Sequence, residues 1–211
     1  MLEVYLFINP LGTQCVRCEH DVLKLDSTLD GNVQYQFIPL LNMQTITNTL
    51  DAYGLNSRDL QLRNNASDTL FQIIMDYKAA LFQGRKRGRA FLLQMQWRLM
   101  HEQREYSAEL AQEIAQTAKL DLDMFVDDRS SKLARQAFTA DQKMANEMGV
   151  TRPSSAVVFD ADRSDYGILI DDFDYQTLAD ICTNKTQELQ KSAQEFANFY
   201  LHQSNPDLHV L

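Results

Sequence analysis

Short apolar segments that suit β-strands occur near both ends of the chain. Residues 2–9 are rich in β-branched and aromatic side chains and end at an Asn-Pro pair, which is a typical strand stop. Residues 33–40 alternate apolar and polar side chains, as a half-buried strand does. Residues 154–160 and 166–170 are apolar again, and the turn-forming residues between them indicate a β-hairpin.

Helical spacing of apolar residues fills the chain between these strands. It predicts one helix from Thr13 to about Leu29, closed by Gly31. From about residue 57 to residue 148 the apolar side chains recur at intervals of three and four. No proline interrupts this block, as expected of helices.

The C-terminal segment carries one more predicted helix. It begins within residues 171–182, where Asp172 or Asp174 suits a helix N-terminus, and it runs to about residue 203. Residues 204–211 continue no such pattern, so we expect them to be frayed.

The order of these elements predicts an α/β fold. Strand, helix and strand are followed by a helical block and then by strand, strand and helix, which is a thioredoxin-like sheet with a helical domain inserted in its middle. We predict a thioredoxin-like domain of residues 1–55 and 149–211 and an inserted helical subdomain of residues 56–148. Both halves of the sheet are needed to close one core, so the insertion is not an independent module.

Composition restricts the class of partner. Hydrophobic residues at 45% and charged residues at 23% are ordinary globular values, and a formal net charge of −9 argues against a nucleic-acid partner. The first strand begins at residue 2 without a basic leader, and no apolar run is long enough to cross a membrane. We therefore expect a cytoplasmic protein with no membrane partner.

Two of the three cysteines form a C-x-x-C pair where the first strand turns into the first helix. A helix N-terminus lowers the pKa of a thiol, and residues three apart on a helix are close enough for a disulfide. The pattern predicts a dithiol in which Cys15 attacks and Cys18 resolves; the simpler alternative is a chance pair of helix thiols. The third cysteine, Cys182, is expected in the core of the last helix.

Pro153 stands just ahead of the strand at 154–160. In a thioredoxin-like site a cis-proline opens the strand opposite the dithiol and aligns the substrate, so Pro153 is a candidate for that role on topology alone. The alternative is a proline that merely starts a strand, and the sequence does not tell the cis bond from the trans.

Other site chemistries lack their ligands. Zinc requires four, and beyond Cys15, Cys18 and His20 the chain has no second C-x-x-C or H-x-x-x-H motif. The segment GRKRG at 84–88 has the wrong glycine spacing for a phosphate-binding loop. We expect no cofactor, metal or small-molecule ligand.

A cluster of cations interrupts this acidic chain. Arg85, Lys86, Arg87 and Arg89 follow Gly84, a plausible helix stop. The simpler explanation is cations at the end of a helix, where the helix dipole favours them. The alternative is a docking patch for an acidic partner, which makes these four residues candidates for partner binding.

Four stretches together resemble the YjbH/SpxH family of low-GC Gram-positive bacteria. They are FINPL at 7–11, YKAALFQGRKRGRAFLLQMQ at 77–96, EIAQTAKLDLDMF at 113–125, and KMANEMGV at 143–150 with the following proline. Members of this family are DsbA-like proteins that act as adaptors delivering the transcription regulator Spx to the ClpXP protease. The resemblance covers most of residues 4–180 and implies these two protein partners.

The sequence departs from the family at the cysteines. Members read F-(I/V)-D-P-L-C-P-x-C-W, so this chain has Gly12 at the position of the attacking cysteine and Cys15 at the resolving position. Cys18 is then an extra thiol one helical turn farther on, where the dipole's effect fades and access is poorer. The alternative register starts the helix later and leaves Cys15 as the exposed thiol.

Two functional hypotheses follow. The favoured one is a cytoplasmic DsbA-like adaptor that binds an Spx-type regulator and promotes its degradation by ClpXP, with Cys15 and Cys18 as a redox sensor if their disulfide alters binding. The alternative is a thiol–disulfide oxidoreductase or isomerase that uses the same dithiol and Pro153.

Overall fold

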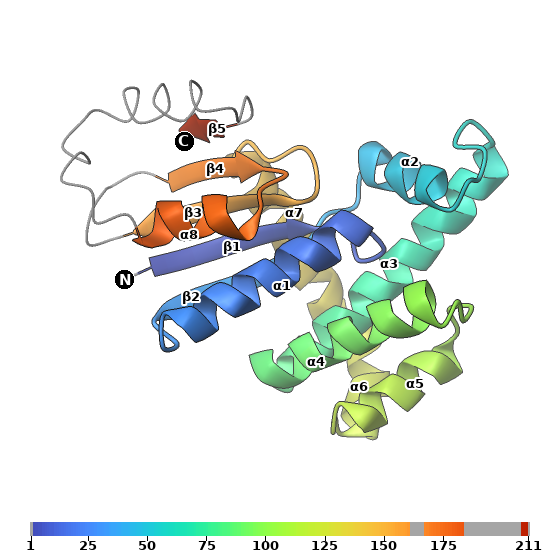
Figure 1. The fold of residues 1–211 in the computed structure, drawn as a ribbon. Coiled ribbons are helices and arrows are strands. Elements are labelled where there is room, and N and C mark those ends of the chain that lie inside the picture. The colour runs from blue at the N-terminus through green and yellow to red at the C-terminus, as the bar shows by residue number, and fades with distance from the viewer. Residues whose placement is uncertain (1, 161–166, 184–207, 211) are drawn as a thin grey trace. The chain divides into compact units, whose positions relative to one another are not determined.

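The computed structural model describes residues 2–160, 167–183 and 208–210 of the chain (Figure 1). Helices and strands follow one another in the order β1 (Leu2–Ile8), α1 (Thr13–Thr28), β2 (Val33–Pro39), α2 (Met43–Ala52), α3 (Leu60–Phe82), α4 (Arg85–Gln96), the π-helical turn η1 (Trp97–His101), α5 (Ala108–Thr117), α6 (Leu122–Arg129), α7 (Lys132–Glu147), β3 (Ser155–Asp160), β4 (Gly167–Asp171), α8 (Tyr175–Thr183) and β5 (Leu208–Val210). Within the described ranges, no helix combines the length and the apolar character that crossing a bilayer would need.

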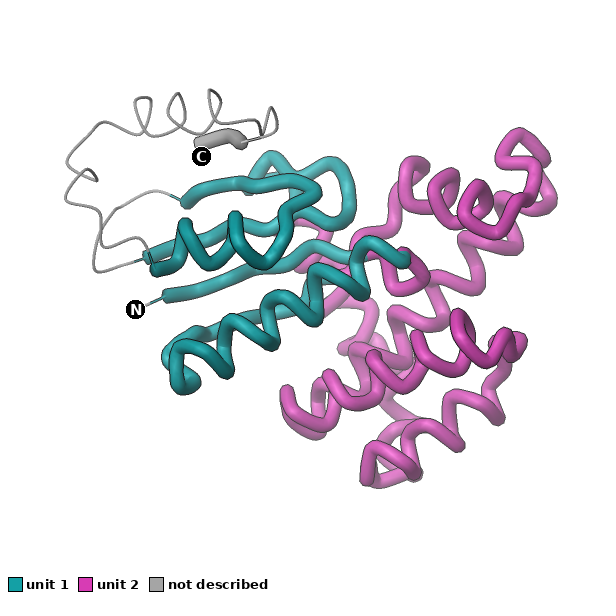
Figure 2. The backbone as a smooth tube through the Cα atoms, viewed as in Figure 1, with its two compact units in different colours: residues 1–8, 13–38, 145–211 teal, residues 9–12, 39–144 magenta. Residues whose placement is uncertain are grey.

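The chain forms two compact units (Figure 2). The sheet unit comprises residues 1–8, 13–38 and 145–211, and the helical unit comprises residues 9–12 and 39–144. Helix α2 belongs to the helical unit because its apolar side chains, Ile46 and Leu50, are buried in the same core as those of α3, α4 and α5. Our domain limits, which begin the inserted subdomain at residue 56, stay a prediction.

The sheet has the strand order β2-β1-β3-β4-β5. Strand β3 pairs antiparallel with β1 on one side and with β4 on the other, so that Val157 stands opposite both Tyr5 and Leu169. Most residues of the central strands β1, β3 and β4 are buried, and Leu6 and Phe7 of β1 are fully buried. Such strands read as continuous apolar runs because both faces of the sheet are covered. The predicted α/β fold with a helical insertion is confirmed.

The C-terminus differs from the prediction. Residues 204–211 were expected to be frayed, but residues 208–210 form β5 and pair antiparallel with β4, with Ile170 opposite Leu208. The physical reason is that β4 would otherwise present unpaired N–H and C=O groups along its outer edge. The described part of the last helix, α8, runs from Tyr175 to Thr183. Its predicted continuation to residue 203 lies outside the described residues.

Buried polar contacts join the helices of the helical unit. Asp76 of α3 accepts hydrogen bonds from Arg129 of α6 at 2.7 and 3.1 Å and from the hydroxyl of Tyr106 at 2.7 Å. Lys78 of α3 forms an ion pair with Asp141 of α7, and both side chains are buried. Each charge is therefore paired where water cannot solvate it.

Candidate functional site

The turn that leads into α1 is built around Asn9, the residue directly after β1. Its side-chain oxygen accepts a hydrogen bond from the N–H of Leu11 at 3.0 Å, and its backbone oxygen accepts one from the N–H of Gly12 at 2.9 Å. Its amide nitrogen donates to the hydroxyl of Thr49 at 2.8 Å. Gly12, where the resemblance predicts the family's attacking cysteine, is half-buried in this turn and carries no side chain.

Cys15 lies in the first turn of α1, yet it is closed to solvent. Only 1% of its surface is exposed, and its Sγ lies 3.1 Å from the hydroxyl of Ser154. Ser154 is held in turn, because its N–H donates to the Phe7 carbonyl at 2.9 Å and its carbonyl accepts from the N–H of Asp172 at 3.1 Å. The loop before β3 therefore covers the thiol, and the register with an exposed Cys15 is not the one that the structure adopts.

Cys18 is one helical turn deeper. Its surface is 0% exposed, and its Sγ lies 3.8 Å from the backbone oxygen of Phe173. Burial above all, together with the neighbouring Cys15 and against the opposing effect of Arg17, raises the pKa of this thiol from 9.0 to about 12. Cys18 is thus a protonated thiol at neutral pH, and a thiol in that state is a poor nucleophile.

The remaining predicted site residues of the sheet unit lie in buried positions. Pro153 is buried directly before Ser154, and the Arg152–Pro153 bond is trans, since no peptide bond in the described part of the chain is cis. Cys182 is 5% exposed in α8, as expected of a core residue. None of the three cysteines forms a disulfide. Elsewhere in the described chain, as here, no three His, Cys, Asp or Glu side chains gather as a metal site would require.

The cation cluster lies at the N-terminus of a helix, whereas our simpler explanation placed it at a C-terminus. Arg85 is the first residue of α4, so the cluster stands at a helix N-terminus, where the dipole disfavours positive charge. Arg85, Lys86 and Arg87 are exposed, and Arg89 is half-buried on the next turn. The explanation of cations stabilised by the dipole is therefore wrong, because α3 ends at Phe82 and Gly84 is already the N-cap of the next helix, α4.

The second glycine of this motif has a packing role. A Cβ built on Gly88 would lie 2.6 Å from Cδ2 of Leu81 and 2.9 Å from its Cα. The backbones of α3 and α4 approach too closely at this point for any larger residue. Part of the family-like QGRKRG segment is thus explained by helix packing, and the exposed cations are not.

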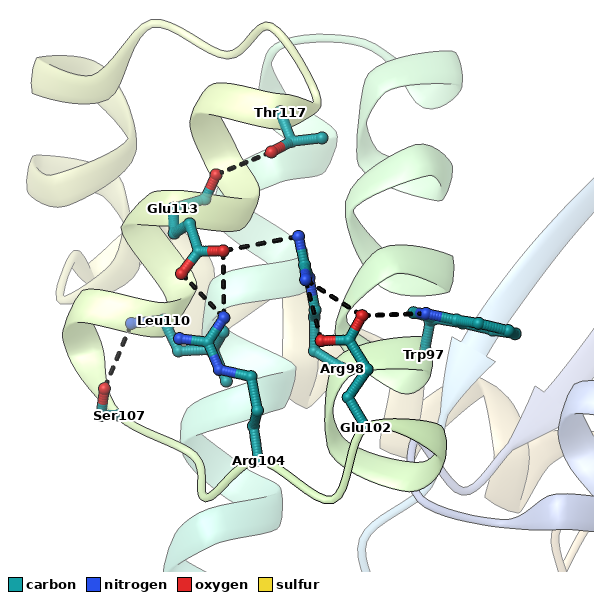
Figure 3. A network of polar contacts seen from close by, with 8 residues as sticks. All are labelled: Trp97, Arg98, Glu102, Arg104, Ser107, Leu110, Glu113 and Thr117. Atoms are coloured by element: carbon teal, nitrogen blue, oxygen red, sulfur yellow. Dashed lines mark hydrogen bonds and ion pairs between the residues drawn. The ribbon is translucent and has the colours of Figure 1, made fainter.

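Sequence reasoning missed an exposed aromatic residue at the far end of α4. Trp97 begins the π-helical turn η1, 52% of its surface is exposed, and its ring stacks on His101 with the centroids 4.3 Å apart. The indole N–H donates to Glu102 at 3.1 Å (Figure 3). Three- and four-residue spacing could not reveal this feature, since a π-turn shifts the helical register.

Sequence comparison finds relatives named ClpXP adapter protein SpxH in several bacteria. Over 80% of its length it is 29% identical to the ClpXP adapter protein SpxH of Bacillus cereus and 26% identical to that of Bacillus subtilis. Over 81% of its length it is 22% identical to the protein of the same name from Staphylococcus aureus. The chain spans 60–63% of the length of these relatives. The resemblance to the YjbH/SpxH family is thereby confirmed.

Solved structures agree on the fold. A candidate protein disulfide isomerase from Nitrosomonas europaea superposes with a TM-score of 0.67 at 10% identity, covering 89% of this chain and 98% of that one. The thiol-disulfide exchange protein alpha-DsbA2 from Wolbachia pipientis gives a TM-score of 0.58 at 16% identity, covering 87% and 81%. The sequence model of a thioredoxin family (Thioredoxin_5) matches residues 5–180. Because this match extends over most of the chain, the chain belongs to this thioredoxin family.

Proposed function

We propose that this chain is the DsbA-like part of an adaptor that binds an Spx-type transcription regulator and promotes its degradation by the ClpXP protease. Relatives named ClpXP adapter protein SpxH match 80% of the chain, although the chain spans only about three-fifths of their length. The observation that carries the proposal is the burial of the thiols: Cys15 is 1% exposed and Cys18 is 0% exposed.

Thiol–disulfide exchange needs an accessible thiolate. Here the hydroxyl of Ser154 lies against Cys15, burial raises the pKa of Cys18 to about 12, and Gly12 supplies no thiol at the start of α1. An adaptor binds its partners through its surface and needs no reactive thiol, so its binding activity does not depend on a solvent-accessible dithiol. In this proposal the protein works in the cytoplasm with two protein partners, and no nucleic acid, membrane, cofactor or small molecule takes part.

The test is a pull-down of an Spx-type regulator by the wild type and by the Cys15→Ser/Cys18→Ser variant, each reduced and oxidised. Serine suits both positions, since its hydroxyl can share a hydrogen bond with the hydroxyl of Ser154 at position 15 and donate one to the Phe173 carbonyl at position 18. We expect the regulator to bind all four samples equally, because thiols this deeply buried do not shape the surface. Binding that oxidation abolishes in the wild type alone would make the pair a redox switch, and absence of binding would refute the adaptor.

A thiol–disulfide oxidoreductase is the second candidate, and one observation favours it. Cys15 is not in a disulfide and lies in the first turn of α1, where the helix dipole favours a thiolate. Exchange at Cys15, with Cys18 resolving, would require the loop of Pro153 and Ser154 to open. Insulin reduction tests this directly: turnover that disappears in Cys15→Ser establishes the enzyme, and the adaptor proposal predicts no turnover in either protein.

A further inference from the structure

One side of α4 carries cations at its start and an exposed indole at its end. Lys86, Ala90, Leu93 and Trp97 follow one another at spacings of four, three and four residues, which places them on the same side of the helix. Lys86 and Trp97 are exposed, and the two residues between them are half-buried. A rise of about 1.5 Å per residue separates the two ends by roughly 16 Å. We call this surface, with Arg85 and Arg87 beside Lys86, the α4 face.

The cations of the α4 face have no carboxylate partner among the described residues. Arg85, Lys86 and Arg87 are exposed and form no ion pair there, whereas Arg98 and Arg129 of the same unit do. The chain has 29 acidic residues and only 20 basic ones, so carboxylates are not scarce. Three unpaired cations at a helix N-terminus also oppose the helix dipole. An anionic partner would relieve both the mutual repulsion of these cations and their conflict with the dipole.

The indole at the other end is held in place before any partner arrives. Trp97 stacks on His101 and donates to Glu102, which also accepts two hydrogen bonds from Arg98 at 3.0 and 2.8 Å (Figure 3). Arg98 in turn lies 3.4 Å from a carboxylate oxygen of Glu113. A ring fixed in this way loses little conformational entropy on binding, and an exposed tryptophan is a typical anchor of protein interfaces.

We infer that the α4 face docks an acidic segment of the regulator that the adaptor binds; this inference rests on the proposed adaptor function. The segment carries carboxylates that meet Arg85, Lys86 and Arg87 and, about 16 Å farther along, an apolar side chain that covers Trp97. Nucleic acid would also offer negative charge and stacking bases. The net charge of −9 repels a polyanion as a whole but tolerates a short acidic peptide.

The experiment measures binding to the full chain with two probes. The first is an Spx-type regulator, titrated by calorimetry at two salt concentrations. The second is a synthetic helical peptide without tryptophan that carries a run of glutamates and, eleven residues farther, a leucine. Trp97 is the only tryptophan of the chain, so indole emission reports on its burial alone. We expect both probes to bind more weakly at higher salt, and the peptide to shift the emission to the blue.

Charge-reversal variants locate the contact. R85E/K86E/R87E should weaken binding of both probes at least tenfold. R58E/K119E/K132E is the matched control, because it reverses three exposed cations outside the α4 face and changes the net charge equally; we expect less than a twofold effect. Trp97→Ala should weaken binding without changing its salt dependence. Circular dichroism establishes that each variant is folded.

The outcomes separate the two proposals. If the regulator binds the wild type and R85E/K86E/R87E equally well, the α4 face is overturned while the adaptor stands. If the regulator does not bind at all, the adaptor proposal fails, and the peptide then decides: binding lost in R85E/K86E/R87E supports the surface, and no binding overturns it. A single-stranded oligonucleotide that binds the α4 face more tightly than the peptide would overturn the assignment to an acidic protein segment.

Discussion

The burial of Cys18 predicts a thiol that scarcely reacts, and the structure sets the size of the effect. Its pKa of about 12 lies three units above the ordinary value of 9.0. At equal pH the thiolate fraction is therefore about a thousandfold lower, which corresponds to roughly 4 kcal/mol. The folded state favours the neutral thiol, so this group stabilises the fold below pH 9 and the contribution is lost as the pH rises through 12.

Alkylation by iodoacetamide at pH 8 measures this reactivity residue by residue. Trypsin cleaves after Arg17, which puts Cys15 and Cys18 on separate peptides for mass spectrometry. We expect Cys18 to be modified at least about a thousandfold more slowly in the native protein than in the same protein unfolded in urea, because only the thiolate reacts. Cys15, which is 1% exposed, should also be protected.

The unfolded sample is the control for intrinsic reactivity. A native rate for Cys18 within tenfold of the unfolded rate would refute the reasoning, since the thiol would then be either ionised or frequently exposed. It would also reopen the oxidoreductase candidate, whose chemistry needs Cys18 to resolve a mixed disulfide at Cys15.

Two further predictions concern stability. Gly88→Ala should lower the free energy of unfolding by about 1–2 kcal/mol in urea titrations. The new Cβ would lie 2.9 Å from the Cα of Leu81, and this overpacking outweighs the better helix propensity of alanine. An unchanged urea midpoint would contradict the close approach of α3 and α4. Burial raises the pKa of Asp76 from 3.8 to about 6 despite the nearby Arg129, so the contribution of this group to stability is present below pH 4 and falls by up to about 3 kcal/mol as the pH rises through 6. Asp76→Asn should therefore flatten the profile of unfolding free energy against pH between pH 4 and 7. A profile as steep as that of the wild type would show that other groups cause the pH dependence.

Local pattern determined much of the fold. The strand at residues 2–9, the helix from Thr13 and the strand at residues 33–40 were predicted to within a residue of β1, α1 and β2. These elements follow from the period of apolar side chains and from Gly and Pro stops, which act over a few residues and need no tertiary context. Their order was enough to predict the thioredoxin-like sheet, because few topologies accommodate it.

The state of the site was decided by tertiary structure. The spacing of Cys15 and Cys18 is the same in an open dithiol as in a closed one, and only the packing of Ser154 and Phe173 against α1 buries the thiols and raises the pKa of Cys18. Burial depends on residues more than a hundred positions away, so no local pattern contains it.

The same distinction explains the cations and the C-terminus. From the sequence, Arg85 could lie at the end of one helix or at the beginning of the next, and the helix dipole favours a cation at the first position and disfavours it at the second. Only the structure shows that Arg85 begins α4. Residues 208–210 carry too short a pattern to predict a strand, and they become β5 because β4 offers them an unpaired edge. The sequence by itself thus determined which elements form and in what order, and the tertiary structure decided which side chains water can reach, because solvation depends on every element packed around a group.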